Sequence, residues 1–154
     1  MTIYFEDLEI GAIEGFGRYE VTREQVIEFA SKFDPQPFHL DDDAAAKSLF
    51  GKIAASGWHT AGMAMRMVVD HWKATGVAET SLGGAGMDEV RWPHPVYPGD
   101  ILRCEIELLE KIPSRSKPFM GILKSRWNVY NQNDVLVMTM ISTGLIRTRS
   151  AENG

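Results

Sequence analysis

The spacing of hydrophobic positions changes along the chain, from a helical period before Ser81 to strand-like alternation after it. In the first part, apolar residues recur at i, i+4, i+7 and i+11 on one helical face: Ala61, Met65, Val68 and Trp72. This spacing predicts a helix over Gly57–Thr75, the longest in the chain, which would span about 28 Å. Ser56 is expected to cap its start, and Gly76 to end it.

Two further helices are predicted ahead of this central one. The first covers Thr22–Phe33, because Thr22 and Gln25 have the spacing of a capping box and Pro35 prevents the helix from continuing. The second covers Asp41–Phe50, which has three acidic residues at its start and Gly51 at its end. The intervening segment contains Pro35 and Pro37 and is expected to be a stiff loop.

The remaining hydrophobic pattern alternates and predicts strands. The expected strands are Ala12–Tyr19, Met87–Trp92, Ile101–Glu110, Met120–Asn131 and Val135–Arg147. Ile101–Glu110 has one apolar and one polar face, whereas Val135–Arg147 is apolar on both faces and should lie inside the sheet. Helices followed by antiparallel strands indicate the α+β class. The sheet would wrap around the long helix in a single domain over residues 1–150, with a disordered tail over residues 151–154.

Composition and charge narrow the possible partners. The chain has 154 residues, 44% of them hydrophobic, which suits one packed domain. Its net charge is -5, which argues against nucleic acid or an anionic membrane as the main partner. The single cysteine, Cys104, excludes a disulfide within the chain and a multi-cysteine zinc site, so a reducing cytoplasm is the expected location. We expect no targeting peptide and no membrane span.

Asp34 and His39 are the candidate acid/base residues. Histidine can take and give a proton near neutral pH, and a nearby carboxylate can act with it. The prolines between them would aim both side chains into one pocket. The alternative is structural: Asp34 ends a helix and His39 is a polar loop residue. On spacing alone, the structural interpretation is favoured.

Gly57 is the candidate carbonyl-binding residue. The first turn of a helix has free N–H groups and a positive partial charge, which stabilise an oxygen that gains negative charge. Here too the spacing alone favours a structural role, as the simple start of a helix. The remaining histidines lack the i, i+4 spacing of a common zinc motif, so no metal site is predicted.

Several motifs resemble the MaoC-like family, which includes R-specific enoyl-CoA hydratases. The run DPQPFH, Asp34 to His39, is similar to the D-x-N-P-x-H signature of that family. The run ASGWHTAGMAMRMVVD resembles the start of the central helix in its acyl dehydratase branch, and PVYPGD is similar to a turn common in hotdog-fold proteins. The resemblance extends from the first predicted helix to the last strand.

The resemblance implies a hotdog fold and a hydratase or dehydratase that acts on a trans-2-enoyl thioester in fatty acid metabolism. It assigns the acid/base pair to Asp34 and His39 and carbonyl binding to Gly57, and we predict that Gln36, Ser56 and Trp58 contact substrate. Gln36 stands where the signature has Asn, and Ser56 stands where many members have His. Neither departure removes the acid/base pair, but both leave the substrate range open. The resemblance also implies a homodimer with acyl-CoA or an acyl-carrier thioester as substrate, and the chemistry requires no cofactor. A hotdog thioesterase or a non-catalytic acyl-thioester binding protein are the alternatives.

Overall fold

The computed structural model describes residues 1–149 of the chain, so the tail predicted over residues 151–154 lies outside the described part. Two short 3-10 turns, η1 (Phe5–Asp7) and η2 (Pro37–His39), accompany the helices α1 (Arg23–Phe33), α2 (Asp42–Ala46) and α3 (Gly57–Thr75). The strands are β1 (Ile13–Glu20), β2 (Ser81–Arg91), β3 (Ile101–Pro113), β4 (Met120–Tyr130) and β5 (Leu136–Arg147).

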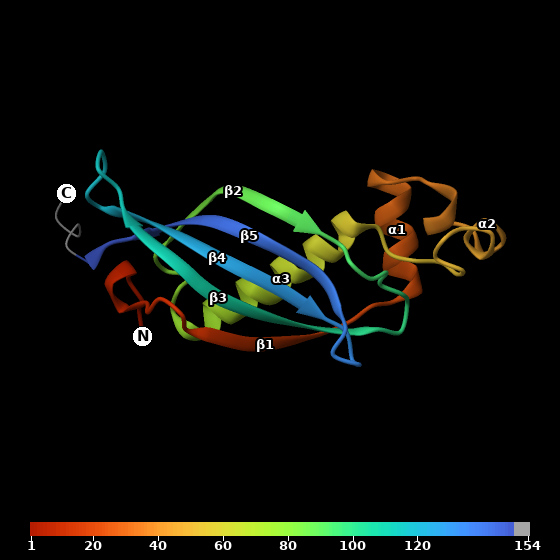
Figure 1. Ribbon diagram of the computed structural model, residues 1–154, viewed down its shortest axis with the longest axis horizontal. Helices are drawn as coiled ribbons and strands as arrows, with labels where there is room; N and C mark the ends of the chain where they lie inside the picture. The colour runs from red at the N-terminus through yellow and green to blue at the C-terminus, as the bar shows by residue number, and fades with distance from the viewer. Residues whose placement is uncertain (150–154) are drawn as a thin grey trace.

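The strands form one antiparallel sheet in the order β1-β3-β4-β5-β2 within the described residues. The strands run along α3, and α1 and α2 lie beyond the end where α3 begins (Figure 1). The predicted arrangement of a long helix with a sheet around it is therefore confirmed. β5 lies between β4 and β2, which confirms that the strand with two apolar faces is inside the sheet.

The core lies between α3 and the inner face of the sheet. Met63, Ala64, Met67 and Val68 are buried on α3, and the predicted inward side chains of β3 begin with the fully buried Leu102. The stripe predicted on α3 lies at the border of this buried face rather than at its centre, since Met65 on that stripe is 38% exposed. The sheet packs instead against the adjacent face of α3, which carries Met63, Ala64, Met67 and Val68.

The predicted C-terminal end of α3 and the predicted Thr22 cap of α1 are confirmed, with one change of detail. Gly76 ends α3 in a left-handed conformation, with φ of 97°, which glycine adopts without steric cost. Thr22 caps α1 by accepting a hydrogen bond from the Gln25 N–H at 3.3 Å. The Gln25 side chain accepts from the Tyr19 hydroxyl at 3.2 Å, so it takes part in a contact outside the predicted capping box.

The prediction of a helix over Asp41–Phe50 was too long. Asp41 caps α2 by accepting from the Ala44 N–H, but the helix ends at Ala46. Ser48 explains the early end, because its hydroxyl donates to the Ala45 carbonyl at 2.6 Å and accepts from the Phe50 N–H at 3.1 Å. Such local side-chain bonds compete with helical backbone bonds.

The prediction of a strand over Met87–Trp92 was too short, because β2 begins at Ser81. The glycine-rich run from Gly83 to Gly86 belongs to the strand and pairs with β5, with register shifts on both sides of Gly84. Glycine has low intrinsic strand preference, so the partner strand determines the conformation here.

Candidate active site

Asp34 lies where α1 ends and the proline loop begins. Its backbone N–H donates to the Ala30 carbonyl at 2.9 Å, and Pro35 prevents another helical turn. The Asp34 side chain is 18% exposed and the His39 side chain only 5%, so the two predicted acid/base residues meet at the edge of the core. The atoms Asp34 Oδ2 and His39 Nε2 are 3.3 Å apart.

His39 is held in one orientation by its other ring nitrogen. Nδ1 lies 2.6 Å from the Ala54 carbonyl oxygen, and because a carbonyl can only accept, Nδ1 must carry a proton. The ring also packs edge-on against Phe38, with centroids 4.6 Å apart. The Ala54 contact leaves Nε2 as the ring nitrogen that faces the Asp34 carboxylate. The sequence held no signal for Ala54, because it acts through its backbone.

The Asp34 carboxyl is ionised at neutral pH. Burial raises its pKa, but a 2.7 Å hydrogen bond from Gln36, the nearby Ser56 hydroxyl and the positive charge that His39 can carry outweigh burial, so the pKa lies below its ordinary value. Gln36, predicted to contact substrate, thus binds the carboxylate of the pair.

Ser56 is fully buried beside this pair. The prediction that its side chain caps α3 was wrong, since no cap hydrogen bond forms. Its hydroxyl is close enough to lower the pKa of Asp34, although among residues 1–149 it completes no hydrogen bond of normal geometry. The Asp34 carboxylate therefore lies close to the residue that precedes α3.

Gly57 begins α3, and its backbone N–H donates no hydrogen bond to any of the described residues. A Cβ built on Gly57 would lie 2.5 Å from Trp92 Cε2, so the indole ring packs directly on the glycine. Trp58, the other predicted substrate contact, is 63% exposed and meets Trp92 edge-on at 5.2 Å. Trp92 could not be predicted from the sequence, because it follows β2 and is not part of the hydrophobic pattern that predicts α3.

Gly57→Ala is expected to reduce the free energy of unfolding by about 1–3 kcal/mol, because the new Cβ collides with Trp92 and overpacks the first turn of α3. Urea unfolding measures this effect, and Gly62→Ala, whose Cβ meets no atom within 4 Å, is the control. A Gly57→Ala/Trp92→Leu double variant should recover stability; no recovery would contradict the collision.

His59 is a buried histidine in the same helical turn. It is 8% exposed and stacks on Phe29 at 4.8 Å, and its Nδ1 has no hydrogen-bond partner in the described part of the chain. Burial lowers its pKa below the ordinary value. The imidazole is therefore neutral in the folded chain, and its surroundings indicate a packing role.

Lowering the pH from about 6.5 to 5 should reduce stability through His59, because unfolded His59 takes up a proton there and folded His59 resists it. The contribution of neutral His59 to the free energy of unfolding is fully present above the ordinary pKa of histidine. It is lost as the pH falls below that pKa. His59→Leu should therefore show a smaller loss of unfolding free energy between these pH values, measured by urea titration at each. An equal loss in variant and wild type would contradict this assignment.

Other groups in the described chain have simpler roles. Cys104 is buried on β3, and burial raises the pKa of its thiol to about 12, so the thiol stays protonated and serves as a packing group. Residues 1–149 contain no group of three His, Cys, Asp or Glu side chains arranged for a metal ion. In the same range, no helix has both the length and the apolar character needed to cross a bilayer.

Comparison with known proteins agrees with this architecture. Residues 12–125 match the MaoC like domain. The chain is 32% identical over 133 residues to uncharacterized protein YdeM of Bacillus subtilis (strain 168), covering 86% of this chain and 90% of that protein. It is 33% identical over 120 residues to 3-hydroxybutyryl-CoA dehydratase of Methylorubrum extorquens, covering 75% of this chain and 69% of that protein.

A solved structure indicates the same protein family. The crystal structure of the MaoC-like dehydratase from Rhodospirillum rubrum is similar with a TM-score of 0.86 and 39% identity, covering 96% of this chain and 98% of that one. The chain belongs to the MaoC-like dehydratase family, and its sheet around α3 is the hotdog fold. The predicted family and fold are confirmed.

Proposed function

We propose that the chain adds water across the 2,3 double bond of a trans-2-enoyl thioester to give an R-3-hydroxyacyl thioester, and catalyses the reverse dehydration. The observation that carries this proposal is the arrangement of two side chains that can take and give a proton. With Nδ1 committed to the Ala54 carbonyl, His39 Nε2 and Asp34 Oδ2 face each other at 3.3 Å. One water molecule can donate a hydrogen bond to each of them, which is the reactant that hydration needs.

In the proposed reaction, His39 acts as base. Nε2 takes one proton from the water as its oxygen bonds to C3, and the Asp34 carboxylate stabilises the resulting imidazolium. The Gly57 N–H, at the positive end of α3, binds the thioester oxygen as negative charge develops on it. The pair then delivers a proton to C2, so the water is added in full and both residues regain their starting state. This proton chemistry requires no metal or redox cofactor.

The carrier and assembly belong to the same proposal. The relative named 3-hydroxybutyryl-CoA dehydratase supports a CoA thioester as substrate, with an acyl-carrier thioester as the alternative. The edge strand β2 is exposed along most of its length, which suits pairing with a second copy in a homodimer. A cytoplasmic location fits the single buried cysteine.

Ultraviolet absorbance of the conjugated enoyl thioester tests the reaction, with crotonyl-CoA and a longer trans-2-enoyl-CoA as substrates. Loss of the enoyl signal without release of free thiol is expected, and chiral analysis of the product should give the R isomer. Thiol release would instead support a thioesterase. No change with any substrate, together with tight thioester binding, would support a non-catalytic binding protein.

A further inference from the structure

The indole of Trp92 lies face-on over the first residue of α3. The three atoms nearest to a Cβ built on Gly57 all belong to this ring: Cε2 at 2.5 Å, Cδ2 at 2.7 Å and Cζ2 at 2.9 Å. Cδ2 and Cε2 are the two carbons that the fused rings share, so a neighbouring atom reaches both of them only from the face of the indole. An aromatic surface therefore covers Gly57 on the side where any other residue would carry its Cβ.

The backbone that carries Trp92 is anchored beside the start of α3. The Val96 carbonyl accepts a hydrogen bond at 2.8 Å from the N–H of Ala55, which comes two residues before α3. Pro93 and Pro95 restrict the backbone between Trp92 and this hydrogen bond. The position of the indole is therefore held by the local backbone as well as by its own packing.

Trp58 supports the indole from another side. The two rings meet edge-on, with centroids 5.2 Å apart and an angle of 76° between the ring planes. Aromatic pairs favour this arrangement over a face-to-face sandwich. Trp92 is 39% exposed, so one part of its ring contacts Gly57 while another part faces solvent. The indole thus separates this side of Gly57 from water.

An apolar cover changes what the Gly57 N–H can do for a bound carbonyl oxygen. Water competes for an exposed N–H and screens the charge that develops on the oxygen. A ring that excludes water from one side lowers the local dielectric and strengthens the hydrogen bond. The gain is largest in the transition state, because the negative charge on the oxygen is largest there. The cover should therefore affect turnover more than initial binding.

We propose that Trp92 is a positioning residue of the hydration reaction: its indole shields the Gly57 N–H from water and so increases the polarisation of the thioester carbonyl. This inference rests on the proposed hydratase function. The indole N–H is only a hydrogen-bond donor, so Trp92 takes no part in the proton transfers. Its effect passes through Gly57, which it contacts directly.

The kinetic test compares Trp92→Ala with the conservative variant Trp92→Phe. Loss of an entire oxyanion donor costs about 10²–10³ in kcat, so loss of the cover should lower kcat for crotonyl-CoA about tenfold and change KM less than about threefold. Trp92→Phe keeps an aromatic face and should stay within about threefold of the wild-type kcat. A wild-type kcat in Trp92→Ala would overturn the inference.

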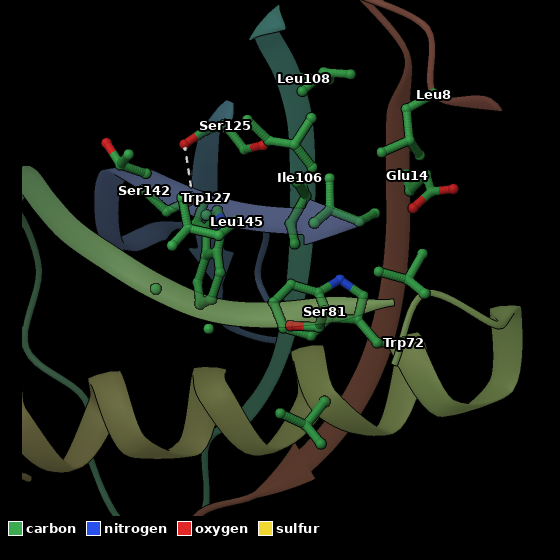
Figure 2. A pocket seen from close by; sticks show the side chains of 18 of the residues that line it. Leu8, Glu14, Trp72, Ser81, Ile106, Leu108, Ser125, Trp127, Ser142 and Leu145 are labelled. Atoms are coloured by element: carbon green, nitrogen blue, oxygen red, sulfur yellow. Dashed lines mark hydrogen bonds between the residues drawn. The ribbon is translucent and has the colours of Figure 1, made fainter. Parts of the chain in front are cut away.

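Trp72→Ala is the matched control for the loss of a tryptophan. Trp72 follows Gly57 by fifteen residues, which places it about 22 Å farther along α3. There it packs edge-on against Trp127, and Figure 2 shows both rings in the lining of a cavity of about 520 Å³. Both alanine variants should unfold at lower urea concentrations than wild type, but only Trp92→Ala should lose kcat. Equal losses of kcat would attribute the effect to general packing and overturn the inference.

Infrared spectra separate failure of this inference from failure of the proposed function. The probe is octanoyl-CoA with an isotope label at the thioester carbonyl, because its stretching frequency falls as the carbonyl is polarised and its saturated chain cannot be hydrated. Binding to wild type should lower the frequency, and binding to Trp92→Ala should give about half of that change. Equal changes in both proteins, or no change in either, would overturn the inference. A change that depends on Trp92 without hydration of any enoyl thioester would contradict the hydratase function and retain the role of Trp92.

Discussion

Asp34→Asn is expected to lower the rate of enoyl thioester hydration about 10²–10⁴-fold, the usual worth of a positioned acid/base group. At neutral pH the Asp34 carboxylate is ionised and lies 3.3 Å from His39 Nε2. A neutral amide of nearly the same size neither stabilises an imidazolium nor accepts a proton. Since Gln36 donates to Asp34 Oδ1, an Asn side chain can keep that hydrogen bond, and the loop should stay in place.

The control for this variant is Asp43→Asn, which removes an exposed carboxylate from α2. Both variants should unfold at urea concentrations close to that of wild type, and only Asp34→Asn should lose turnover of the enoyl thioester. Equal activity in Asp34→Asn and wild type would remove the carboxylate from the mechanism and favour the structural interpretation of Asp34 as a helix end.

The sequence predicted those features of the site that depend on neighbouring residues. Pro35 and Pro37 constrain the backbone between Asp34 and His39, so their proximity follows from local chemistry. The bounds of α3 were likewise predictable, because its apolar period and Gly76 are local signals. The alternation of apolar and polar positions predicted the strands of the sheet, because a strand with one buried face shows this pattern.

Contacts between segments that are far apart in the chain could not be predicted from the sequence. The Ala54 carbonyl fixes the tautomer of His39, yet a backbone acceptor has no residue-type signal. Trp92 reaches Gly57 only because β2 ends beside α3, and the extra length of β2 depends on its pairing with β5. The cavity beside α3 that Ser125, Ser142 and Gly144 line depends on the register between β4 and β5, which the sequence does not reveal.

His39→Gln should produce a loss of similar size, about 10²–10⁴-fold. The Gln amide can donate to the Ala54 carbonyl in place of Nδ1, so the buried oxygen keeps a partner, but the amide does not take up a proton at neutral pH. His71→Gln is the control, because His71 is near the far end of α3 and pairs with Glu14. It should retain turnover of crotonyl-CoA.

Measuring both directions makes the test of His39 more specific. The variant cannot change the equilibrium between enoyl and 3-hydroxyacyl thioester, so kcat/KM must fall by the same factor for hydration and for dehydration. A folded His39→Gln protein that retains wild-type kcat/KM in both directions would exclude His39 as the base.

The Asp34→Asn/His39→Gln double variant should be about as slow as the slower single variant. If one water is held between His39 Nε2 and Asp34 Oδ2, removing either residue already breaks the arrangement, and the second substitution has little left to remove. Two residues that act independently would instead give a loss equal to the product of the single losses. The double-mutant cycle, with kcat/KM measured for one enoyl thioester in all four proteins, therefore decides between a shared water and two separate roles.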